Sequence, residues 1–193
     1  TATTRRAEPA RNVNTASASR ATQTALCLCS THLQLVNITE YLAEQDVDRA
    51  HLVVLESEAV DRDITAFAQE QYPTRFASIS RVLRPSQKDL RRRPRHWLAA
   101  RRRFLRTLQK AVNGAGTINV GVFGHGAEIY AGAAYRLAGR PPVVIVDDGT
   151  DTYRFLTDAA LRARLRRGRA WNLKRLLYRS DLSFVDRAQF YTL

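Results

Sequence analysis

Short apolar runs alternate with amphipathic segments along most of the chain. The runs TALCLC, HLVVL and VVIV are rich in β-branched and other apolar residues, a composition typical of strands buried on both faces. Between them, apolar residues recur at helical spacing, as with Leu33, Val36, Ile38 and Leu42. This alternation predicts an α/β fold, a Rossmann-like, doubly wound and mostly parallel sheet.

The predicted elements follow one another at regular intervals. Ser30 and Thr31 are predicted to cap the first helix, and the Tyr72–Pro73 pair to end the second. The chain around Pro85 and Pro94 is expected to be irregular. The strands are predicted at 24–29, 51–55, 75–80, 117–123, 143–146 and 181–185, and the later helices at 59–70, from 96 onward, 127–137, 152–165 and 171–177.

Residues 1–23 differ from the rest in composition. They are rich in Ala, Thr, Ser, Asn and Arg and show no apolar periodicity, so we expect a flexible arm before a domain that spans 24–193. The chain starts at Thr1, contains no methionine and stops in the apolar sequence QFYTL. These features favour a piece of a longer protein.

The chain is strongly basic, with a formal charge of +13 and an isoelectric point near 10.8. Such a balance favours an anionic partner, which could be nucleic acid, an acidic membrane surface or an acidic polysaccharide. Residues 91–110 contain no acid, and we predict a polyanion-binding surface there. No base-stacking or DNA-reading motif is present, which disfavours nucleic acid. The predicted polyanion-binding residues are Arg91, Arg92, Arg93, Arg101, Arg102 and Arg103.

Cys27 and Cys29 are the only cysteines and lie two residues apart in a predicted strand. They share one face, too close for an ordinary disulfide, and lack the spacing of a metal site. Buried, reduced thiols are expected, which fits a cytoplasmic protein or one that lies peripherally at the inner face of a membrane. No apolar run has the length of a membrane span.

The sequence PPVVIVDDGTD is the strongest candidate for a functional site. Ligands of open α/β sheets bind beyond the carboxyl ends of the strands, where Asp147, Asp148 and Gly149 are expected. If the pair is partly buried, mutual repulsion should raise the pKa of one of the two carboxylates, which suits a general base. Gly149 would let the backbone pass close to a ligand. Alternatively, Asp148 or Asp151 caps the following helix and Asp147 is solvated.

Two further turns are candidates for substrate binding. Gly124-His125-Gly126 opens a helix, whose backbone amides could hold an anion, although His125 could equally be an ordinary loop histidine. The turn after the first strand contacts substrate or simply caps its helix. Its candidate residues are Ser30, Thr31, His32 and Gln34.

The stretches LCLCSTHLQLVN and VVIVDDGTD together resemble the bacterial sialyltransferases and polysialyltransferases that build capsular and lipooligosaccharide glycans. The resemblance implies two Rossmann-like halves facing a cleft. It also implies that Asp147 or Asp148 deprotonates the acceptor hydroxyl as this attacks the anomeric carbon of a CMP-activated sialic acid. In that family the second half supplies a His-Pro motif and serine or threonine residues that hold the CMP.

The chain departs from this family at two points. Many members carry proline where His32 stands, and no His-Pro dipeptide occurs in the 193 residues. The resemblance therefore implies an amino-terminal, acceptor-side domain that is inactive without its donor half. Its expected partners are a CMP-activated sugar as co-substrate, with no metal or other cofactor, and an acidic glycan acceptor. The alternatives are a transferase domain that uses another nucleotide-activated donor, and a non-enzymatic basic module that binds nucleic acid or anionic surfaces.

Overall fold

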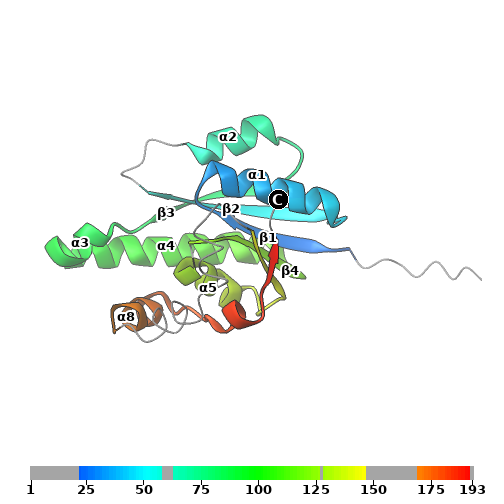
Figure 1. Ribbon diagram of the computed structural model, residues 1–193. Coiled ribbons are helices and arrows are strands. Elements are labelled where there is room, and N and C mark those ends of the chain that lie inside the picture. Colours follow the sequence, from blue (N-terminus) through cyan, green and yellow to red (C-terminus); the bar gives the residue numbers. More distant parts are fainter. Residues whose placement is uncertain (1–21, 58–62, 127, 147–168, 192–193) are drawn as a thin grey trace, which may run out of the picture.

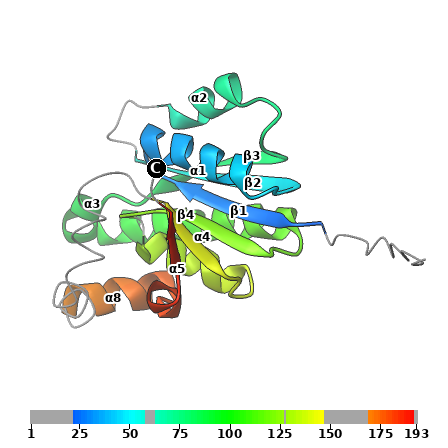
Figure 2. The same cartoon turned by 45° about the vertical axis from the view of Figure 1, so that its right-hand side comes forward.

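The computed structural model describes residues 22–57, 63–126, 128–146 and 169–191. Within them, six strands form one sheet in the order β3-β2-β1-β4-β5-β6, and every pair of neighbours is parallel. Helices cover both faces of this sheet (Figures 1 and 2). The predicted Rossmann-like, doubly wound fold is confirmed. The strands are β1 (Thr24–Cys29), β2 (Arg49–Ser57), β3 (Ser78–Arg84), β4 (Val120–Gly124), β5 (Val143–Val146) and β6 (Gln189–Tyr191).

The two faces of the sheet support separate apolar cores. Because side chains alternate along a strand, Leu26 and Leu28 of β1 point to one face while Cys27 and Cys29 point to the other. The first face packs against α4 (Pro94–Ala115), α5 (Glu128–Leu137) and α8 (Arg169–Tyr178). The second packs against α1 (His32–Glu44) and α2 (Ile64–Gln71).

Both cysteines are fully buried free thiols, as predicted. Burial is the main cause that raises the pKa of Cys29 to about 12, so the thiol stays protonated and unreactive at neutral pH.

The strand order reverses between β1 and β4. Chain segments on the β1 side proceed outward through β2 and β3, and those on the β4 side proceed outward through β5 and β6. The turns that leave β1 and β4 therefore diverge at the carboxyl edge of the sheet. In open α/β sheets this switch point is where ligands bind.

Helix α1 has a different buried stripe from the predicted one. Leu33 is 50% exposed, whereas Leu35, Ile38 and Leu42 are buried, with Gln34 beside them. The structural reason is that Gln34 has hydrogen-bond partners inside the fold, which allows a polar residue on the inward face.

Several predicted elements differ from the observed ones in position or type. The fourth strand, predicted from Thr117, begins at Val120. Strand β3 begins three residues later than predicted, because Phe76 turns its ring into the core before the ladder with β2 starts. The segment expected to be irregular contains α3 (Gln87–Arg92), and α4 begins at Pro94, a favourable first helical residue.

The predicted strand 181–185 is also wrong: it contains a 3₁₀-helix instead, η1 (Ser183–Asp186). The Asp181 carboxylate accepts a hydrogen bond from the Ser183 amide at 3.0 Å, which forms a turn. The Phe184 ring then packs against Phe123 and Tyr135. The last strand follows as β6. The predicted helix 152–165 lies outside the described residues.

Candidate functional site

Gln34 joins the two turns at the switch point. Its Oε1 accepts hydrogen bonds from the Ser30 amide at 2.8 Å and from the Ser30 hydroxyl at 3.2 Å. Its Nε2 donates to the carbonyl oxygen of His125 at 2.6 Å, across a separation of 91 residues. The side chain is 1% exposed. The structure thus brings together the two turns predicted as candidates for substrate binding, and Gln34 fixes their spacing.

The close approach of these turns requires glycine at 124. A Cβ atom built there would lie 2.3 Å from Oε1 of Gln34, well inside van der Waals contact. Glycine therefore allows the backbone of β4 to pass directly against the Gln34 amide.

Thr31 has the predicted capping role. It precedes α1 in an extended conformation, and its Oγ1 accepts a hydrogen bond from the Gln34 amide at 3.1 Å. The same residue, Gln34, thus contributes its backbone to the helix start and its side chain to the link with β4. Ser30 remains half-buried at the surface of this group.

The second turn contains an acid that was not among the predicted residues. Oε1 of Glu128 lies 3.4 Å from Nε2 of His125 and accepts a hydrogen bond from the Gly126 amide at 2.9 Å. Gly126 has a φ of 85°, a left-handed conformation that favours glycine. Two signals could have identified Glu128: its place in the first turn of a helix, and its spacing of three from His125.

These contacts bear on the predicted anion site. The His125 amide donates to the carbonyl oxygen of Val146 at 3.2 Å, and the Gly126 amide donates to Glu128. The amides of His125 and Gly126 are thus both engaged within the chain. An anionic ligand would have to displace the Glu128 carboxylate to reach the Gly126 amide.

The hydrogen bond from His125 to Val146 also ties this turn to the last residue of β5. Asp147, Asp148 and Gly149 follow Val146 directly in the sequence and lie outside the described residues.

His32 is oriented toward a different neighbour. Its ring packs edge-on against Phe67 of α2, with 4.9 Å between the ring centroids.

Glu56 is a second acid that was not predicted: it is buried at the carboxyl end of β2. It accepts hydrogen bonds from the Thr65 hydroxyl at 2.7 Å and from Arg81 at 2.5 Å, so its contacts serve to join β2, β3 and α2.

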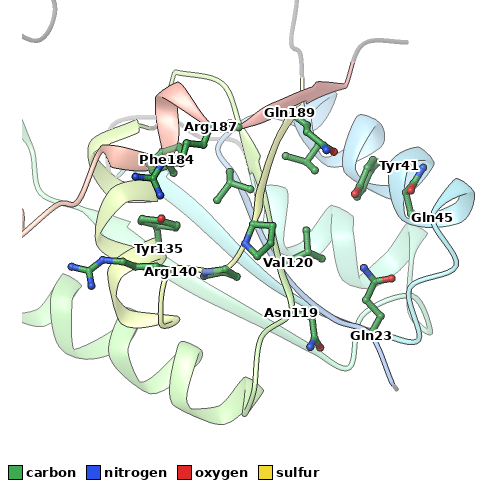
Figure 3. Close-up of a pocket in the computed structure, with 15 residues that line it drawn as sticks. Gln23, Tyr41, Gln45, Asn119, Val120, Tyr135, Arg140, Phe184, Arg187 and Gln189 are labelled. Carbon is green, nitrogen blue, oxygen red and sulfur yellow. The ribbon is translucent and has the colours of Figure 1, made fainter. Parts of the chain in front are cut away.

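A large hollow of about 560 Å³ lies at the opposite edge of the sheet (Figure 3). Side chains that surround it include Gln23 and Asn119, which precede β1 and β4, and Gln189 at the start of β6. Since these are the amino ends of the strands, the hollow is separate from the switch point. Arg140, one of its cations, is paired with Asp181 at 2.7 Å.

The predicted polyanion-binding arginines fall into two groups. Arg92 and Arg93 are exposed at the end of α3, and Arg102 and Arg103 are exposed on α4. Arg101 instead donates a hydrogen bond from Nε to the carbonyl oxygen of Leu177 and so holds α8 against α4. Arg91 lies in α3, and its side chain is outside the described part of the structure.

Within the described ranges, no three or more His, Cys, Asp or Glu side chains gather in a geometry that could hold a metal ion. None of the helices described is both long and apolar enough to cross a membrane.

No protein-family model matches the chain, and no curated protein matches its sequence. Among solved structures, the chain is similar to the crystal structure of TcCGT1 in complex with UDP, with a TM-score of 0.43 and 9% sequence identity. The similarity covers 76% of this chain and 32% of TcCGT1, so the chain spans about a third of that protein's length.

Proposed function

We propose that this chain is the acceptor-side Rossmann-like domain of a sialyltransferase-like glycosyltransferase, in which Asp147 or Asp148 is the general base. One observation carries the proposal. The side chain of Gln34 joins the two turns predicted to contact substrate at the switch point. The backbone amide of His125 also donates a hydrogen bond to the carbonyl oxygen of Val146, the residue directly before Asp147.

In this proposal the acceptor sugar binds beside the turns after β1 and β4. One aspartate of the pair accepts the proton of the acceptor hydroxyl, and the hydroxyl oxygen forms a bond to the anomeric carbon of the donor. The bond between that carbon and the donor phosphate breaks, and the nucleotide leaves with the electron pair. Repulsion between adjacent carboxylates favours a proton-accepting pKa in one of them.

The nucleotide-binding half is not assigned to these residues. The sequence contains no His-Pro dipeptide, which in the resembled family belongs to the donor half. We therefore assign the donor site to a second domain of the same protein, and the acceptor site to this chain. Sialic acid is the first donor to test, and other nucleotide-activated sugars form the alternative.

The test uses the protein as it is expressed from its own gene. Transfer to a glycan acceptor is measured with CMP-sialic acid and, in parallel, with a panel of other nucleotide sugars. Asp147→Asn and Asp148→Asn are compared with the unaltered protein and with Asp46→Asn, an aspartate after α1. Loss of a general base lowers turnover by about 100-fold or more.

We expect one of the two site variants to show this loss while Asp46→Asn retains turnover. Full activity in both Asp147→Asn and Asp148→Asn would exclude the aspartates as the base. Transfer from another nucleotide sugar but not from CMP-sialic acid would keep the reaction class and replace the donor.

A further inference from the structure

A second surface lies on the α4–α5–α8 side of the sheet, apart from the switch point. A groove of about 490 Å³ lies between α4 and α5, and a hollow of about 370 Å³ lies beside the end of α8. Arg179 lines both, so the two are adjacent parts of one surface. We call it the basic surface and define it by Arg106, Lys110, Arg136, Arg175, Leu176 and Arg179.

The described residues that line the two hollows include five cations and no carboxylate. The ion pairs found among the described residues are all made by other side chains. Arg136 donates to the carbonyl oxygen of Arg179 at 2.8 Å, which orients its guanidinium without neutralising its charge. Like charges converging without a counter-charge create a strong local attraction for anions.

Helix electrostatics account for only part of this arrangement. Arg136 and Arg175 lie in the last turns of α5 and α8, where a cation stabilises the helix dipole. Arg106 and Lys110 lie inside α4, well before its end at Ala115, and both are exposed. Neither side chain takes part in the ion pairs found among the described residues.

Apolar side chains accompany these cations. Leu176 lines the smaller hollow and is 75% exposed, and Leu173, one helical turn earlier on α8, is 53% exposed. Nucleic acids are bound mainly through phosphate contacts from basic and polar groups, and an exposed leucine adds little there. At an anionic bilayer both kinds of side chain contribute, since leucine enters the headgroup boundary while arginine and lysine meet the phosphates.

We propose that the basic surface docks the protein peripherally onto an anionic phospholipid membrane. The proposal is independent of the reaction proposed above, because none of its residues belongs to the switch-point turns. The geometry is compatible with both roles. Helix α5 starts beside the end of β4 and returns toward the start of β5, so Arg136 in its last turn lies toward the edge opposite the candidate site.

The test is cosedimentation of the 193-residue chain with vesicles. One set is equimolar phosphatidylcholine and phosphatidylglycerol, a second set is phosphatidylcholine alone, and double-stranded DNA serves as a soluble polyanion. The chain is expected to bind the first set and not the second. Added salt is expected to release it from the first set.

Two variants separate the charged and apolar contributions. Arg106→Gln combined with Lys110→Gln should lower the partition coefficient about 25-fold, because each cation near an anionic surface is worth about fivefold. Leu176→Ser should lower it about tenfold. The matched control, Arg49→Gln with Arg187→Gln, removes the same charge from two exposed arginines, one at the start of β2 and one just before β6, and should leave binding within about twofold.

Absence of binding to the anionic vesicles would overturn the proposal. So would equal losses in the variant pair and in the control pair, since net charge alone would then explain binding. If the chain binds DNA more tightly than vesicles and Leu176→Ser changes neither, the surface is a nucleic-acid surface instead. Asp147→Asn and Asp148→Asn should bind vesicles like the unaltered chain, which keeps this test separate from that of the reaction.

Discussion

The switch-point turns (Ser30–Gln34 and Gly124–Gly126) and the basic surface differ in how their polar side chains are buried and paired. At the switch point, Gln34 is 1% exposed and both ends of its amide are hydrogen-bonded to backbone. On the basic surface, Arg106 and Lys110 are exposed, and the structure gives neither of them a carboxylate partner within the described residues. A buried polar group must be satisfied internally, whereas an exposed one remains available to a ligand.

This comparison has a direct consequence for mutagenesis. Changes at the switch point should act first on stability, because they leave buried groups without partners. Changes on the basic surface should act on binding and leave the free energy of unfolding nearly unchanged.

The largest effect is expected at Gln34. Gln34→Ala leaves the Ser30 amide and the His125 carbonyl without their partner and should lower the free energy of unfolding by about 3 kcal/mol. Gly124→Ala should cost about 2 kcal/mol, since the new methyl group meets the Gln34 amide. Urea unfolding followed by circular dichroism measures both.

The double variant shows whether these two residues act through each other. With alanine at 34, the Cβ at 124 no longer meets an amide, so the two costs should fall short of additivity by about 1 kcal/mol or more. Gly114→Ala is the matched control, because its Cβ would have open space inside α4 and should stabilise slightly. Strict additivity would mean that the turns are not coupled through Gln34.

An intermediate effect is expected from Asp181, which joins the exit of α8 to α5. Burial alone would raise the pKa of its carboxyl, but hydrogen bonds from Arg140 and Ser183 outweigh burial and hold the pKa at about 2. A carboxyl in an unfolded chain has a pKa near about 3.9. The stabilisation is therefore fully present above pH 4 and is lost as the pH falls from about 4 to about 2.

The loss attributable to Asp181 should be about 1 kcal/mol, because Arg140 is largely exposed and solvent weakens the pair. Urea unfolding at a series of acidic pH values measures it as the difference between the unaltered chain and Asp181→Asn. The variant should be less stable at neutral pH, and the two curves should converge in acid. Parallel curves would show that Asp181 does not titrate in this range.

The smallest effect is expected on the basic surface. Arg106→Gln with Lys110→Gln should change the free energy of unfolding by less than about 0.5 kcal/mol, since neither side chain has an internal ion pair in the described structure. The same urea experiment measures this change. A loss as large as that of Gln34→Ala would erase the contrast between the two regions.

The amino-acid sequence by itself determined the fold class, most strand positions and the pairing of turns at one edge. Buried β-branched runs such as VVIV favour a strand covered on both faces, and alternation with helices favours a parallel sheet whose carboxyl ends meet. For the same reason the sequence places the Ser30–Gln34 and Gly124–Gly126 turns at the carboxyl ends of strands in one sheet.

Only the tertiary structure decided how those turns are joined. Nothing local distinguishes Gln34 from an exposed helix residue, because its partner, the His125 carbonyl, is 91 residues away. The change from a predicted strand to η1 has a similar origin. Phe184 is apolar in either conformation, and its contacts with Phe123 and Tyr135, together with the Asp181 turn, select the helical one. Long-range contacts fix which apolar or polar side chain faces inward, and a local pattern carries no information about partners so distant in the chain.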